Sequence, residues 1–193
     1  MSNRLSKIYT GKGDDGTSGL ADGTRLPKDD LVFVAMGDID ELNCHIGMIL
    51  AYMPAGITRC NELTVIQHLL FNLGGEMATQ NPNNYRGIYD EHWRYLEKCM
   101  DKMNARLPPL KEFILPKGSV LVCQTHLARS IARRAERSAT TLKRQNPNAI
   151  SDDGLKFLNR LSDYLFVLGR YLTDERETSE TFWHKDILAD LNS

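Results

Sequence analysis

Arg129-Ser130-Ile131-Ala132-Arg133-Arg134-Ala135-Glu136-Arg137 is the stretch of this sequence with the densest and most regularly spaced charge. Arg129, Arg133 and Arg137 are four residues apart, so a helix places these three side chains along one face. The surrounding run, 119–143, contains no proline or glycine and predicts such a helix. We expect its opposite face to be core, with these side chains: Val120, Cys123, Leu127, Ile131 and Ala135.

The charge balance of this stretch leaves two interpretations open. Glu136 lies three residues after Arg133 and seven after Arg129, so one carboxylate balances only part of the arginine row. The simpler interpretation is a solvated face with ion pairs that contribute little to stability. The alternative is a site for a polyphosphate, because guanidinium groups bind phosphate oxygens in pairs.

Four further segments have the apolar spacing of amphipathic helices. We expect them at 30–52, 58–78, 91–106 and 152–173, joined by short loops with helix-breaking residues. A chain of 193 residues is long enough for one domain with its own core. The expected fold is therefore all-α: a single five-helix bundle within 30–173, preceded by a segment 1–29 and followed by a flexible tail, 174–193.

Polar residues interrupt the apolar pattern of the first and last expected helices. In the first, Asp40 and Glu41 belong to an acidic cluster that is either solvated or bound to an arginine of another helix. In the last, Asn159 and Asp163 are one turn apart and can share a polar target. Arg160 can pair with Asp163.

Residues 8–20 are rich in glycine and predict a loop rather than a helix or strand. Glycines allow backbone N–H groups to approach a phosphate closely, and Lys12 can add a charged donor. The segment lacks the Gly-Lys-Ser/Thr ending of a P-loop, which argues against an ordinary P-loop kinase or ATPase. A plain surface loop and a phosphate-binding loop both remain open.

Phe113 lies in a short segment, 111–118, that has prolines near both ends and that we expect to be extended. Its ring either fills the core or contacts a ligand. We refer to this segment as the connector.

Composition excludes several classes of partner. A formal net charge of −1 and a pI near 6.5 give no reason to expect binding to nucleic acid or to an anionic membrane. We expect no membrane span and no secretory signal. The four cysteines show no paired spacing, so we expect reduced, mostly buried thiols in a cytoplasmic protein. The five histidines form no cluster that predicts a protein-bound metal.

Taken together, these motifs resemble the PduO-type ATP:cob(I)alamin adenosyltransferases over nearly the whole chain. The resemblance rests on six segments: 9–10 with 13–16, Lys28, 40–43, 113–116, 129–137 and 157–164. It implies a homotrimer of ferritin-like five-helix bundles in which the N-terminal segment 1–29 binds ATP. ATP and a corrinoid would bind between adjacent subunits and give adenosylcobalamin, with Mg²⁺ on the phosphates. The implied ATP contacts are Thr10, Gly11, Lys12, Gly13, Ser18, Gly19, Lys28, Arg129, Arg133, Arg134, Glu136, Arg137 and Asn159.

The resemblance also implies the remaining site residues. Phe113 and Asp163 would contact cobalamin, with Phe113 against the lower face of the corrin. Arg133, Asp40 and Phe113 would be the catalytic residues, and Asp40 would pair with Arg133 of a neighbouring subunit. A flavin-type reductase and an adenosylcobalamin-dependent enzyme are the implied protein partners.

Two positions depart from the family pattern. Gly11-Lys12 follows Tyr9-Thr10 where a lysine is expected first, and Lys117-Gly118 stands where two glycines are expected. The main alternative function is a corrinoid- or nucleotide-binding carrier or sensor without catalysis. Adenosylcobalamin formation in the presence of ATP and reduced corrinoid distinguishes the two.

Overall fold

The computed structural model describes residues 9–54, 59–81, 83–175 and 179–187. It contains five helices: α1 (Leu31–Tyr52), α2 (Arg59–Thr79), α3 (Asp90–Asn104), α4 (Val120–Gln145) and α5 (Asp152–Asp174). All five predicted helices are present, each within two residues of its predicted ends, although Thr58 lies outside the described residues. The all-α prediction is confirmed.

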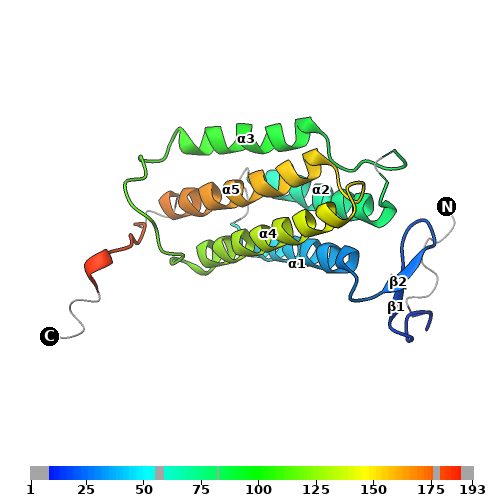
Figure 1. Cartoon of the computed structure of the whole chain (residues 1–193). Coiled ribbons are helices and arrows are strands. Elements are labelled where there is room, and N and C mark those ends of the chain that lie inside the picture. Colours follow the sequence, from blue (N-terminus) through cyan, green and yellow to red (C-terminus); the bar gives the residue numbers. More distant parts are fainter. Residues whose placement is uncertain (1–8, 55–58, 82, 176–178, 188–193) are drawn as a thin grey trace.

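The helices lie side by side as a bundle (Figure 1). α1 packs against α2 and α4, α4 packs against α5, and α5 packs against α3. Leucine, isoleucine and alanine side chains from all five helices form one continuous core. Among the described residues, no helix is both long and apolar enough to cross a membrane.

Short polar side chains cap the helices that carry the site. Asp30 accepts a hydrogen bond from the Val32 N–H at 3.0 Å and so begins α1. Ser119 does the same for the Val122 N–H of α4, and Ser151 for the Gly154 N–H of α5. Each cap satisfies a backbone donor that the first helical turn leaves free.

The start of α5 is held by buried polar contacts. Glu76 of α2 is fully buried and accepts hydrogen bonds from the backbone N–H groups of Gly87, Ile88 and Ser151, at 2.8, 3.2 and 2.6 Å. One carboxylate thereby ties the α2–α3 loop to the α4–α5 loop.

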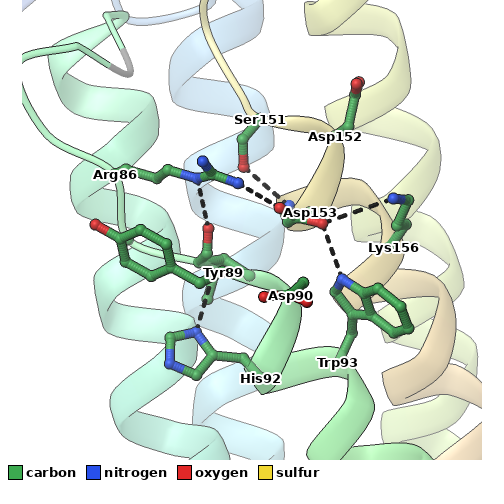
Figure 2. A network of polar contacts seen from close by, with 12 residues as sticks. Arg86, Tyr89, Asp90, His92, Trp93, Ser151, Asp152, Asp153 and Lys156 are labelled. Carbon is green, nitrogen blue, oxygen red and sulfur yellow. Dashed lines mark hydrogen bonds and ion pairs between the residues drawn. The ribbon is translucent and has the colours of Figure 1, made fainter.

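A second group of contacts meets on Asp153, as Figure 2 shows. Trp93 Nε1 donates to Asp153 Oδ1 at 2.9 Å, and Arg86 and Lys156 pair with the same carboxylate. Burial raises the pKa of Asp153, but the hydrogen bond from Trp93 and the two cations lower it overall. These contacts position α5, and with it the polar residues further along that helix.

The predicted core face of α4 is only partly right. Ile131 and Ala135 are buried, but Val120, Cys123 and Leu127 are exposed. Because α4 packs between α1 and α5, its buried positions spread over a wider arc and include several alanines, which give a weak hydrophobic signal: Leu121, Val122, Ala128, Ala132, Ala139 and Leu142.

The expectation of mostly buried thiols is wrong. Cys99 is buried and Cys60 is half-buried, whereas Cys44 and Cys123 are exposed.

The glycine-rich segment was predicted to be a loop without a helix or strand, but the structure shows that it includes a strand. β1 (Thr17–Gly19) pairs antiparallel with β2 (Arg25–Pro27), and the hairpin projects beyond the start of α1 (Figure 1). Gly16 precedes β1 with φ +81°, and Gly23 lies in the turn with φ +89°, a backbone conformation that favours glycine. Ile8, which the prediction included, lies outside the described residues.

Part of the tail, residues 179–187, runs beside the connector, a contact that the prediction of a flexible tail did not include. Ile114 and Phe182 form an antiparallel bridge. The Leu115 N–H donates to the Thr181 carbonyl at 2.8 Å. We refer to residues 179–187 as the tail segment.

Candidate functional site

The arginine row is a cationic surface on α4. Arg133 and Arg137 are exposed, and within the described ranges no carboxylate lies at ion-pair distance from either guanidinium. Arg137 Nη1 donates only to the Arg133 carbonyl, at 3.2 Å. Arg129 is half-buried and its Nε has no hydrogen-bond partner in the described structure. Burial and the nearby charge of Arg133 both lower the pKa of Arg129. The row therefore carries uncompensated positive charge.

Arg134 differs from the other arginines of the stretch. Its Nε bonds Asp38 Oδ1 at 3.0 Å, and its Nη2 pairs with Glu41. Ser138 also donates to Asp38. Of the two interpretations left open for the acidic cluster, binding to an arginine of another helix is the one observed for Glu41, and the contact holds α4 against α1. The predicted ATP contact of Arg134 stays a prediction, and this side chain already has two carboxylate partners.

A chain of polar contacts lies beside the row, between α4 and α5. Asn159 Nδ2 donates to Glu136 Oε1 at 2.9 Å. Arg160 Nη1 donates to Asn159 Oδ1 at 2.6 Å, and Arg160 Nε donates to Glu97 Oε1 of α3 at 2.7 Å. The predicted Arg160–Asp163 ion pair is wrong, because the guanidinium turns toward the carboxylate of α3 instead.

Asp163 lies on the same face of α5 and interacts electrostatically with this group. Burial raises its pKa, and the charge of Glu136 adds to that effect, while Arg160 and Arg133 oppose it. The structure therefore brings Arg133, Glu136, Asn159 and Asp163 together from two separate helices; the family resemblance implied that all four belong to the site. Glu97 joins this group of residues through its hydrogen bond with Arg160. It was not predicted, because nothing in the sequence distinguishes it from the other acidic residues of α3.

The N-terminal candidates form a second group. The Lys28 N–H donates to the Gly16 carbonyl at 2.9 Å, and Lys28 Nζ lies so close to Gly13 that a Cβ there would meet it at 3.2 Å. Arg25 donates to the Lys12 carbonyl and to the Thr17 hydroxyl, which closes the turn. These contacts place Gly13 and Gly16 beside Lys28; the ATP contacts of Thr10, Gly11, Lys12, Gly13, Ser18 and Gly19 stay predictions.

The two groups are separated within one chain. Figure 1 shows the hairpin beyond the end of the bundle, whereas the arginine row lies in the middle of α4. The Ala21 N–H donates to the Ala78 carbonyl at 3.0 Å, which ties the hairpin to the end of α2. Within a single chain, the glycine-rich loop therefore does not lie next to the arginine row.

Phe113 does not fill the core: 76% of its surface is exposed. The tail segment holds its backbone, since the Trp183 N–H donates to the Phe113 carbonyl at 2.7 Å. Phe113, Ile114, Leu115 and Trp183 line an open cavity of about 320 Å³. Trp183 was not predicted, because the polar sequence around it gives no sign that it pairs with the connector.

Asp40 faces away from its own arginine row. It lines an apolar groove of about 470 Å³ between α1 and α2, and Gly37, Gly74 and Gly75 line the same groove. Asp38, two residues earlier, faces α4. Residues two apart on a helix point about 200° away from each other, so Asp40 is directed outward. No sequence signal marked this groove.

Comparison with known proteins gives a consistent result. A sequence model described as "Cobalamin adenosyltransferase" matches residues 8–172. A cobalamin adenosyltransferase of Cupriavidus metallidurans is 43% identical over 188 residues, 96% of this chain and 98% of the relative. A corrinoid adenosyltransferase of Bacillus subtilis is 41% identical over 167 residues, 85% of each chain.

Solved structures of similar proteins share the fold. A phenylalanine-to-alanine variant of a PduO-type ATP:corrinoid adenosyltransferase from Lactobacillus reuteri, complexed with cobalamin and ATP, superposes with a TM-score of 0.87 at 34% identity, covering 93% of this chain and 100% of that one. An arginine-to-lysine variant from the same organism, complexed with ATP, gives 0.86 at 35% identity, covering 92% and 100%. The chain belongs to the cobalamin adenosyltransferase family.

Proposed function

We propose that this protein transfers the 5′-deoxyadenosyl group of ATP to the cobalt(I) of a reduced corrinoid, giving adenosylcobalamin and inorganic triphosphate. The observation that carries the proposal is the uncompensated arginine row beside Asn159 and Glu136, in a chain whose solved relatives are complexed with ATP and cobalamin.

The chemistry asks for alignment and charge stabilisation. Cobalt(I) is itself a strong nucleophile: its electron pair forms the bond to C5′, the C5′–O bond breaks, and triphosphate leaves with the electron pair of the broken C5′–O bond. No proton must be removed, so the reaction needs no general base. The protein must align C5′ with cobalt and stabilise negative charge on the leaving triphosphate.

The arginine row suits the second task. Arg133 and Arg137 are exposed and project from one face of α4, where each planar guanidinium can bind two phosphate oxygens. Lys12, Lys28 and the loop amides add further donors for the phosphates. Mg²⁺ would accompany the triphosphate; in the described part of the chain no group of three or more acidic, cysteine or histidine side chains could hold a metal by itself.

Phe113 suits a different task. Cobalt(II) is hard to reduce while water or the corrinoid's own dimethylbenzimidazole tail occupies its lower axial position. An aromatic ring against that face excludes both and eases formation of cobalt(I). The exposure of Phe113, beside Trp183 and above an open cavity, supports this role over a packing role.

A homotrimer would complete the site. The hairpin with its loop lies away from the arginine row of its own chain, and Asp40 is directed away from it as well. In a trimer, the glycine-rich loop and Asp40 of one subunit would each reach the arginine row of an adjacent subunit. Asp40 would then pair with Arg133 of that neighbour. A flavin-type reductase would supply the electron for the reduced corrinoid, and an adenosylcobalamin-dependent enzyme would use the product. The cytoplasm is the compartment that we propose for all three proteins.

The direct test mixes the protein with ATP and chemically reduced corrinoid and measures adenosylcobalamin by mass spectrometry, with ATP omitted as the control. The proposal expects ATP-dependent product. Binding of both compounds without product would instead indicate a carrier or sensor on the same bundle.

A further inference from the structure

Glu97 lies on α3, one helix away from the arginine row, yet it ends the chain of contacts that includes Asn159. The chain runs from Glu97 through Arg160 and Asn159 to Glu136, with donor–acceptor distances of 2.7, 2.6 and 2.9 Å. We propose that Glu97 is a positioning residue: through Arg160 it sets the orientation in which the Asn159 side chain meets ATP. The inference rests on the proposed ATP contact of Asn159.

The orientation matters because an asparagine amide has two unlike ends of nearly the same shape. Rotation by half a turn exchanges the carbonyl acceptor with the NH₂ donor. Arg160 offers only donors, so it selects the carbonyl end of Asn159. The Glu136 carboxylate offers only acceptors, so it selects the NH₂ end. The reversed amide would place donor against donor and acceptor against acceptor.

One donor is then left for a substrate. Asn159 Nδ2 carries two hydrogens, and Glu136 Oε1 accepts one of them. Asn159 is half-buried and bonded to Glu136, which lies three residues from the exposed Arg133 on α4, so we expect its remaining N–H to face the arginine row. A phosphate or ribose oxygen of ATP can accept that hydrogen only while the amide keeps this orientation.

Arg160 cannot hold the amide without help from another helix. Consecutive residues on a helix do not face each other, so the Arg160 side chain must turn back to reach Asn159. Glu97 holds Nε while Nη1 serves Asn159. Without Glu97, the cation would turn toward Asp163, three residues along the same helix, whose pKa it already influences. The Asn159 carbonyl would then lose its donor.

Replacement of Glu97 by alanine tests this role. Loss of one charged hydrogen bond behind Asn159 is expected to raise the KM for ATP about three- to ten-fold. The kcat at saturating ATP should stay within about two-fold of the parent, and Glu97→Gln, which keeps the acceptor oxygen, should recover part of the loss. Asp90→Ala is the matched control, since Asp90 forms an exposed ion pair with Arg94 on the same helix. The control should leave the KM unchanged, and the melting temperatures of both variants show how much of any effect is loss of stability.

A double-mutant cycle excludes a general structural effect. In an Asn159→Ala background, Glu97→Ala should add no further change in the KM for ATP, because no amide remains to be oriented. An equal effect of Glu97→Ala in both backgrounds would overturn the proposal. So would a parent-like KM in Glu97→Ala while Asn159→Ala raises it. If Asn159→Ala itself leaves the KM unchanged, the proposed ATP contact fails, and the positioning role fails with it.

Discussion

The backbone N–H of Trp183 donates to the carbonyl oxygen of Phe113 at 2.7 Å, so a residue of the tail holds the backbone of the connector. The tail segment is itself held by Glu180, which forms an ion pair with Arg170 of α5 at 2.6 Å. Only 6% of the Arg170 side chain and 15% of the Glu180 side chain are exposed. The position of the connector therefore depends on the ion pair that joins the tail segment to α5.

Replacement of Glu180 by glutamine should loosen the connector. Amide hydrogen exchange at Leu115 and Trp183, whose N–H groups bond across the two segments, is expected to become at least several-fold faster. Glu175→Gln is the control, since Glu175 pairs with Arg106 at a more exposed position. Unchanged exchange in Glu180→Gln, or equal acceleration in both variants, would show that the ion pair does not hold the tail.

Phe113→Ala is expected to leave the fold intact. A core phenylalanine costs about 3–5 kcal/mol when truncated, whereas a side chain this exposed should cost well under about 1 kcal/mol. The defect should be chemical: turnover that starts from cobalt(II) should fall far more than turnover from prepared cobalt(I).

Electron paramagnetic resonance provides the second measurement for this variant. The signal of four-coordinate cobalt(II) should appear with the parent protein and ATP and fade in Phe113→Ala. Equal loss of turnover from both starting states, together with a large drop in melting temperature, would assign Phe113 to packing.

Arg133→Lys and Arg137→Lys should each raise the KM for ATP more than about ten-fold, because lysine keeps the charge but loses the planar fork. Arg144→Lys is the control on the same helix; Arg144 is also exposed, but it lies in the last turn of α4. Steady-state kinetics at varied ATP measures the effect. If both Arg133→Lys and Arg137→Lys kept the parent's KM for ATP, the arginine row would be a solvated face that does not bind ATP.

Asp40→Asn should weaken both the trimer and turnover, because it leaves an arginine of the neighbouring subunit unpaired at a cost of about 2–5 kcal/mol. Glu41→Gln is the matched control, since Glu41 pairs with Arg134 inside its own chain. Light scattering measures the assembly, and a monomer mass for the parent would contradict the trimer. A double-mutant cycle of Asp40 with Arg133 measures the coupling energy of the proposed pair. The same cycle with Arg129, whose Nε is unpaired in the described structure, tests whether Asp40 pairs with that arginine instead.

The helices of this protein were predictable because apolar spacing, capping residues and loop prolines agree along the chain. The family resemblance named Asn159 and Glu136 as ATP contacts on two helices that were each predicted correctly, but the hydrogen bond between these two side chains was not predicted. The β1–β2 hairpin was missed because its strands are three residues long and surrounded by glycine. Such short strands carry too little alternation to distinguish them from a loop.

The remaining misses depend on which helices are neighbours. Arg160 chose Glu97 over Asp163 because α3 packs against α5, which periodicity within one helix does not reveal. The contact of Trp183 with Phe113 joins two extended segments that are far apart in the sequence. The exposed side of α4 was likewise misjudged at Leu127, since the sequence does not show which helices cover it.

Attack of cobalt(I) at C5′ of ATP releases all three phosphates as one triphosphate, so the carbon and phosphate products together distinguish this reaction from any other use of ATP. ATP labelled with ¹³C at C5′ is mixed with the protein and reduced corrinoid, and the products are followed by ¹³C and ³¹P nuclear magnetic resonance. We expect the labelled carbon to become bonded to cobalt and intact triphosphate to appear in equal amount. Release of phosphate or diphosphate by the protein, or tight binding of ATP and corrinoid with no cobalt–carbon bond, would contradict it.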